Sequence, residues 1–167
     1  MDWYKWRESL GRDHARHWGR RGEDGPPRAR VLFESPDGAE AHAVWSLLNR
    51  YGYDTMWCPG PSDHPARDCT LVRAGHCPLV DGADVIVNAL DQSDGKCGEV
   101  ARSLDNSADV ARSRPVVVVQ PPSGAADLAA SLPHCDVVPG PLRSGVLVRV
   151  VTKAATPQGQ EAPSTAH

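Results

Sequence analysis

The segment Ala83-Asp84-Val85-Ile86-Val87-Asn88-Ala89-Leu90 decides the fold class of this chain. The three β-branched residues at its centre are typical of a strand that is buried on both faces of a parallel sheet. The run Val116-Val117-Val118-Val119 has the same character, and Val31-Leu32-Phe33 is a shorter example. These runs predict the central strands of a sheet that is covered on both sides.

Strand-like and helical segments alternate outward from this segment. Apolar runs predict five strands, at Val31–Phe33, Tyr53–Trp57, Val85–Val87, Val116–Val119 and Asp136–Val138. Apolar residues at helical spacing predict helices over 41–51, 100–111, 125–132 and 144–151, with Gly52 ending the first and Ser144 capping the last. Such alternation predicts an α/β fold with a five-stranded parallel, doubly wound sheet of the flavodoxin-like type.

The 167 residues divide into a body over 30–154 and two tails. Residues 1–29 are basic, contain Trp3 and Trp6, and end at the linker-like Gly25-Pro26-Pro27. They form either a flexible extension, which we favour, or a segment that docks against the body or a partner. Residues 155–167 are rich in polar residues and proline without apolar periodicity, which predicts a disordered tail.

The composition excludes several classes of function. With 40% hydrophobic and 23% charged residues and a net charge of −3, the chain is typical of a globular domain. No run is long enough to span a membrane, and the N-terminus lacks the apolar core of a signal peptide, so we expect a cytoplasmic protein. We expect no membrane partner and no nucleic-acid binding by the body. The five cysteines are then expected to be reduced thiols or metal ligands.

Three segments carry a resemblance to a known family. The segments are Arg30–Phe33, Asp84–Leu90 and Asp136–Leu142. In order and spacing they resemble the first, third and fifth strands of the receiver domain of two-component signalling. The resemblance implies the five-stranded sheet described above and places Pro141 at the family's cis-proline position.

The resemblance does not extend to the family's phosphoryl chemistry. A receiver requires acidic residues after the first strand for Mg²⁺, an aspartate nucleophile after the third, a hydroxyl after the fourth and a lysine after the fifth. The matching positions in this chain are Ser35 and Pro36, Ala89, Gln120 and Gly140. Because all of them are substituted, the sequence indicates a degenerate receiver, or pseudo-receiver, without catalytic residues.

Acidic residues follow the third predicted strand at Asp91, Asp94 and Glu99. They permit a weak cation site, since α/β sheets bind ligands at the carboxyl ends of their strands. The alternative, which we favour, is a solvated loop in which Asp94 lies at a helix N-terminus.

A cysteine-bearing connection precedes the third strand. Cys58, Cys69 and Cys77 lie within twenty residues of one another in the pattern C-x10-C-x7-C, together with His64 and His76. Four prolines between 58 and 78 predict that no regular helix forms there. Three thiolates and one histidine suit tetrahedral Zn²⁺, and three thiolates could also hold an iron–sulfur cluster. The alternative is that these cysteines are buried small apolar residues.

Three functional hypotheses follow. The first is a non-catalytic signalling or interaction module that binds a protein partner or a second copy through its fourth helix, fifth strand and fifth helix, the surface that receivers use. The second is a metal or redox sensor built on the cysteine-bearing connection. The third, a small enzyme on a flavodoxin-like scaffold, ranks last because no nucleophile–base pair is present.

Overall fold

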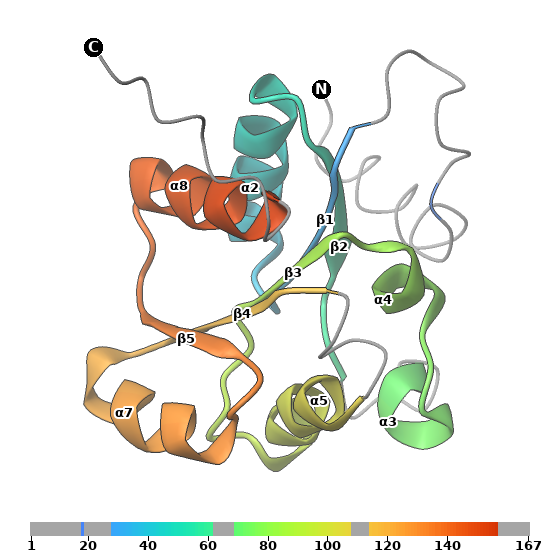
Figure 1. Ribbon diagram of the computed structural model, residues 1–167, viewed down its shortest axis with the longest axis vertical. Coiled ribbons are helices and arrows are strands. Elements are labelled where there is room, and N and C mark those ends of the chain that lie inside the picture. Colours follow the sequence, from blue (N-terminus) through green and yellow to red (C-terminus); the bar gives the residue numbers. More distant parts are fainter. Residues whose placement is uncertain (1–17, 19–27, 62–68, 108–113, 157–167) are drawn as a thin grey trace, which may run out of the picture.

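The computed structural model describes Trp18 and residues 28–61, 69–107 and 114–156. Its five strands form one parallel sheet in the order β2-β1-β3-β4-β5 (Figure 1). The strands are β1 (Arg30–Glu34), β2 (Asp54–Cys58), β3 (Val85–Asn88), β4 (Val116–Gln120) and β5 (Asp136–Pro139). The predicted fold class and the five predicted strands are confirmed.

Helices cover both faces of the sheet (Figure 1). On one face, α2 (Gly38–Arg50) and α8 (Ser144–Ala155) enclose a core that includes Phe33 and Val87. On the other face, α3 (Thr70–Ala74), α4 (Pro78–Gly82) and α5 (Gly95–Asn106) enclose a core that includes Leu32 and Ile86. A further helix, α7 (Pro122–Ser131), packs beside β5. Side chains of alternate strand residues enter the two cores, as a doubly covered sheet requires.

Side-chain caps and glycine set several helix boundaries. Asp37 caps α2, because its carboxylate accepts hydrogen bonds from the backbone N–H groups of Ala39 and Glu40. Gly52 follows that helix in the left-handed region at φ +86°, as predicted. The prediction that Ser144 caps the last helix is wrong: Arg143 holds the capping position, and Ser144 is the first residue of α8.

The connection from β2 to β3 contains helix, contrary to the prediction. Both α3 and α4 form within it, each five residues long. Pro78 is compatible with helix because it is the first residue of α4, where a missing N–H removes no intrahelical hydrogen bond. The described residues do not include 62–68 of this connection. They also do not include 108–111, the end of the helix predicted over 100–111.

Three further sequence predictions concern one peptide bond, membrane-spanning helices and the two tails. The Gly140–Pro141 peptide bond is cis, as the resemblance implies. No helix among the described residues is long and apolar enough to cross a membrane. Trp18, a described residue of the amino-terminal segment, contacts the body; whether residues 1–29 are flexible or docked, and the boundaries of the two tails, remain predictions.

Candidate functional site

The candidate site lies where the order of the strands reverses. Glu34 is the last residue of β1, and its register partners are Cys58 on β2 and Asn88 on β3. Because β1 continues to β2 through α2 on one side and pairs with β3 on the other, the carboxyl ends of β1 and β3 flank the topological switch point. Open α/β sheets bind their ligands at this point.

A buried hydrogen bond joins the two strand ends. Nδ2 of Asn88 donates to Oε2 of Glu34 over 2.7 Å, and both side chains are almost inaccessible to solvent. Burial raises the pKa of Glu34 from 4.5 to about 7, and the hydrogen bond from Asn88 opposes part of that rise. A carboxyl–amide pair of the chain itself thus lies at the switch point.

A set of amide side chains extends this pair across β3 and β4. Oδ1 of Asn88 accepts from Nε2 of Gln92 at 2.9 Å and from the backbone N–H of Leu90 at 3.2 Å. Nε2 of Gln120, at the end of β4, donates to the carbonyl oxygen of Leu90 at 3.0 Å. Within the described part of the chain, Oε1 of Gln92 is buried and has no hydrogen-bond partner. We call Glu34, Asn88, Gln92 and Gln120 the amide cluster.

The loop after β1 closes the site from the side of β2. Oγ of Ser35 donates to Oε2 of Glu40 at 2.7 Å and accepts from the backbone N–H of Asp37 at 3.2 Å. The indole N–H of Trp57 donates to the carbonyl oxygen of Ser35 at 2.8 Å. This loop is therefore held to both α2 and β2, and Ser35 is buried.

The five positions named from the receiver resemblance all lie at this edge of the sheet. Ser35 and exposed Pro36 follow β1, and Gln120 ends β4. Ala89 follows β3 and donates its backbone N–H to the carbonyl oxygen of Glu34, while Gly140 donates to the carbonyl oxygen of Gln120 at 2.7 Å. The edge was thus correctly located from the sequence.

Sequence reasoning missed Glu34 and Asn88 as the central pair. The available signal was that a polar residue directly ends each of two apolar strands. Their contact depends on the register Glu34↔Asn88, which the sequence alone does not specify.

The acidic residues after β3 have structural roles. Oδ1 of Asp91 accepts from the backbone N–H and the hydroxyl of Ser93, and these hydrogen bonds lower the pKa of the exposed Asp91. Asp94 caps α5 by accepting from the backbone N–H groups of Lys96 and Cys97. The favoured interpretation, a solvated loop with Asp94 at a helix N-terminus, is confirmed for Asp94, and Glu99 is exposed on α5.

The three cysteines of the predicted metal site pack against the same apolar core. Cys58 ends β2, whereas Cys69 and Cys77 immediately precede α3 and α4. Burial, followed by the negative charge of Glu34 and by the other two thiols, raises the pKa of Cys58 above its ordinary value. Burial is also the main cause of the raised pKa of Cys69. The raised pKa values keep the thiols of Cys58 and Cys69 protonated at neutral pH when no metal is bound.

Of the two histidines, only His76 is described, and it is not grouped with these cysteines. His76 is exposed, with Nδ1 4.0 Å from a carboxylate oxygen of Asp81, and His64 lies outside the described residues. Across residues 28–61, 69–107 and 114–156, no group of three or more His, Cys, Asp or Glu side chains is arranged to hold a metal ion. Cys97 and Cys135 pack against the core as well.

No protein-family model and no curated protein matches this chain. Three solved structures show the likeness of fold. The signal receiver domain of a signal transduction histidine kinase from Syntrophus aciditrophicus is 17% identical, with a TM-score of 0.57, covering 83% of this chain and 98% of that one. The chemotaxis protein CheY4 of Vibrio cholerae is 13% identical with a TM-score of 0.55, covering 76% and 98%. A response regulator from Thermotoga maritima is 16% identical with a TM-score of 0.53, covering 77% and 98%. With its parallel sheet in the order β2-β1-β3-β4-β5, this chain has the fold of a response-regulator receiver domain.

Proposed function

We propose that this protein is a pseudo-receiver: a signalling module that takes up no phosphoryl group and acts by binding another protein chain. The observation that carries the proposal is the buried hydrogen bond between Glu34 and Asn88 at the switch point. An amide is not a nucleophile, and both polar atoms of the Asn88 side chain are engaged within the amide cluster.

The surroundings of Asn88 support the same proposal. After β3, the first carboxylate along the chain is Asp91, which is exposed and is hydrogen-bonded to Ser93. The last position of β4 holds Gln120, whose amide nitrogen donates to the backbone carbonyl oxygens of Leu90 and Val119. The neutral amides of Asn88 and Gln120 support the proposal, because phosphoryl transfer needs a nucleophile and charged or hydroxyl ligands.

The test is incubation of the full chain with acetyl phosphate and Mg²⁺, followed by intact-mass measurement. A receiver domain that has its phosphoacceptor aspartate serves as the positive control under the same conditions. We expect no mass increase in this protein while the control gains one phosphoryl group. An acid-labile phosphoryl adduct on an aspartate would refute the proposal.

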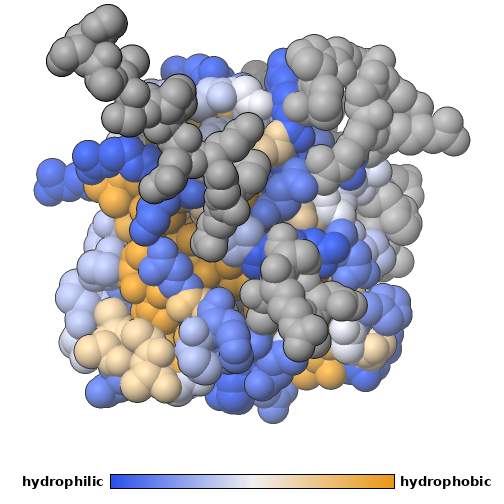
Figure 2. Space-filling view, viewed as in Figure 1, coloured by the Kyte–Doolittle hydropathy of each residue, from blue (hydrophilic) through white to orange (hydrophobic). Residues whose placement is uncertain are grey.

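The surface formed by α7, β5 and α8 is the proposed docking face. No residue of α7 is buried, and β5 is an edge strand whose residues are only half-buried or exposed. Figure 2 shows apolar side chains gathered between α8 and α7, where β4 and β5 run. The half-buried apolar residues of this region include Val119, Leu142 and Val148. An edge strand beside apolar surface suits a second copy of the chain or another protein.

Light scattering coupled to size exclusion tests the homodimer form of this docking. If the wild type is dimeric, Val148→Glu on α8 should shift it to monomer, because a charge in an apolar interface remains unpaired. Exposed Arg149→Glu, one residue along the same helix, is the matched control and should have a much smaller effect. A monomeric mass at all concentrations would exclude the homodimer and leave a protein partner.

A metal or redox sensor is the second proposed function. Cys58, Cys69 and Cys77 pack against one core, and the other two thiols contribute to the raised pKa of Cys58. This proximity favours a shared role. Zn²⁺ or an iron–sulfur cluster bound by these thiols, with His64 or His76 as a further ligand, would displace protons from the cysteines, so loading should improve as pH rises.

Elemental analysis of protein purified without oxygen tests this second proposal. The triple replacement of Cys58, Cys69 and Cys77 by serine should abolish any bound metal, whereas Cys135→Ser should leave it unchanged. Metal below about a tenth of an equivalent in the wild type, unaffected by the triple replacement, would rule the sensor out.

A further inference from the structure

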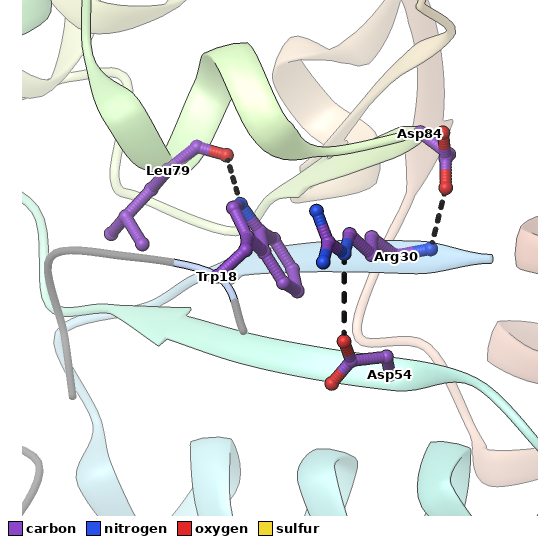
Figure 3. Close-up of polar contacts among 5 residues, drawn as sticks. All are labelled: Trp18, Arg30, Asp54, Leu79 and Asp84. Atoms are coloured by element: carbon purple, nitrogen blue, oxygen red, sulfur yellow. Dashed lines mark hydrogen bonds and ion pairs between the residues drawn. The ribbon is translucent and has the colours of Figure 1, made fainter. Parts of the chain in front are cut away.

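Trp18 contacts the edge of the sheet opposite to the amide cluster (Figure 3). Its indole N–H donates to the carbonyl oxygen of Leu79 on α4 over 2.8 Å. The guanidinium carbon of Arg30, at the start of β1, lies 5.4 Å from the centre of the indole ring. Trp18 therefore makes one directional hydrogen bond and one cation–π contact with the body.

The arginine under the ring is held in place by two other strand ends. The backbone N–H of Arg30 donates to a carboxylate oxygen of Asp84, just before β3, over 2.8 Å. Its Nε lies 3.6 Å from a carboxylate oxygen of Asp54, the first residue of β2. Arg30 is also almost completely buried. Its position is thus fixed by β1, β2 and the approach to β3 independently of Trp18.

Gly82 supplies a flat surface against which the ring lies. A Cβ atom added at Gly82 would fall 2.0 Å from Cδ1 of the indole, which is far inside van der Waals contact. The indole ring can lie against Gly82 because glycine has no side chain. In addition, the last four carbonyl groups of a helix lack intrahelical partners, and Leu79 belongs to this set in the five-residue α4.

These three features are complementary to one chemical group. The carbonyl oxygen requires an N–H donor, the guanidinium requires an electron-rich ring, and the glycine requires a planar one. We infer that Arg30, Leu79 and Gly82 form an indole-recognition site at the amino-terminal edge of the sheet, which Trp18 fills within the same chain. The site holds the Trp18 side chain against the receiver-like body.

Rescue by a soluble indole tests the inference. Trp18→Ala should lower the melting temperature by about 3 to 8 °C, as is typical for the loss of a partly buried aromatic contact. Millimolar 3-methylindole should then raise the melting temperature of the variant by mass action, but should leave the wild type, whose site is filled, unchanged. 1-Methylindole lacks the N–H donor and should bind up to about tenfold more weakly.

Trp18→Ala combined with Gly82→Ala is the control, because the added Cβ occupies the place of the ring. The double variant should show no rescue. Equal melting temperatures for wild type and Trp18→Ala, or equal responses of the single and double variants to 3-methylindole, would overturn the inference.

A second measurement does not depend on the folding of Trp18→Ala. Arg20 and Arg21 follow Trp18 in the sequence and are sites for trypsin. Gly82→Ala should speed cleavage there several-fold by displacing the ring. Gly95→Ala is the matched control, because a Cβ at Gly95 meets nothing within 4 Å. Equal cleavage rates in the two variants would also contradict the inference.

Discussion

Glu34 combines two properties that oppose each other in a folded protein. Its carboxyl group is buried at the end of β1. There it accepts a hydrogen bond from the buried, neutral amide of Asn88. Loss of hydration favours the protonated form, which is why the pKa rises to about 7. The negative form also raises the pKa of Cys58 nearby. The protonation state of this residue is therefore coupled to folding.

Glu34→Gln is expected to change how stability depends on pH. Below pH 4.5 the carboxyl is protonated in both states and contributes no difference. Between 4.5 and about 7 the unfolded chain has lost the proton that the folded chain keeps, so wild-type stability falls as pH rises. The variant should lack this fall and exceed the wild type above pH 7 by about 3 kcal/mol at most.

Urea unfolding at several pH values measures this difference. Glu99→Gln, an exposed position on α5, is the matched control and should follow the wild-type curve. Parallel curves for wild type and Glu34→Gln over the whole range would show that the glutamate is not buried as described.

Asn88→Ala should destabilise the fold by about 1 to 3 kcal/mol at neutral pH. The change removes the donor to Glu34 and the acceptor for Gln92, leaving polar atoms buried without partners. Asn106→Ala, at the exposed end of α5, should lower the free energy of unfolding by about 0.5 kcal/mol at most. Chemical denaturation of the three proteins gives the comparison, and similar losses for both variants would speak against a central role of Asn88.

The connection between β2 and β3 shows at the level of elements how local sequence signals can mislead. Four prolines of this segment argue against helix, but Pro78 is the first residue of α4, a position that tolerates proline. Apolar burial then decides the outcome: Leu71, Leu79 and Val80 of the two short helices are buried in the core. A proline count could not anticipate this, because the deciding contacts are made with distant strands.

Asp94→Ala should destabilise α5 and lower the free energy of unfolding by about 1 kcal/mol, because two backbone N–H groups lose their acceptor. Asp91→Ala is the matched control: Asp91 is exposed and its side chain bonds only within its own turn. Thermal unfolding of both variants measures the difference. Equal effects would show that Asp94 does not act as the helix cap.

At the scale of the whole molecule, the sequence was sufficient to predict the fold class and all five strands. Apolar runs such as Val85–Val87 report burial directly, and their alternation with helices implies parallel pairing. The site was harder to predict from the sequence, because Glu34 and Asn88 are 54 residues apart and are brought together only by the register of their strands. The sequence left docking of residues 1–29 as an alternative but could not identify Trp18 as the contact, because its hydrogen-bond partner Leu79 is 61 residues away.

The thiols report on the integrity of the whole domain. Burial raises the pKa of Cys58 and Cys69, and burial together with Asp105 raises that of Cys135 to about 12. At pH 8, an aromatic disulfide reagent should therefore modify these cysteines in the native protein at least about tenfold more slowly than in urea, because the thiolate is the reactive form. Equally fast modification of all five cysteines in both conditions would contradict this expectation.

The order of the strands also has a consequence for the time course of folding. Although β3 follows β2 in the chain, it pairs on the other side of β1. β1 and β2 are separated in the chain only by α2 and its loops. β1 and β3 are separated by a much longer stretch, and closing the longer loop costs more entropy. We expect β1 to acquire β2 before β3. The contact between Glu34 and Asn88 needs β3 beside β1, so it forms after the pairing of β1 with β2.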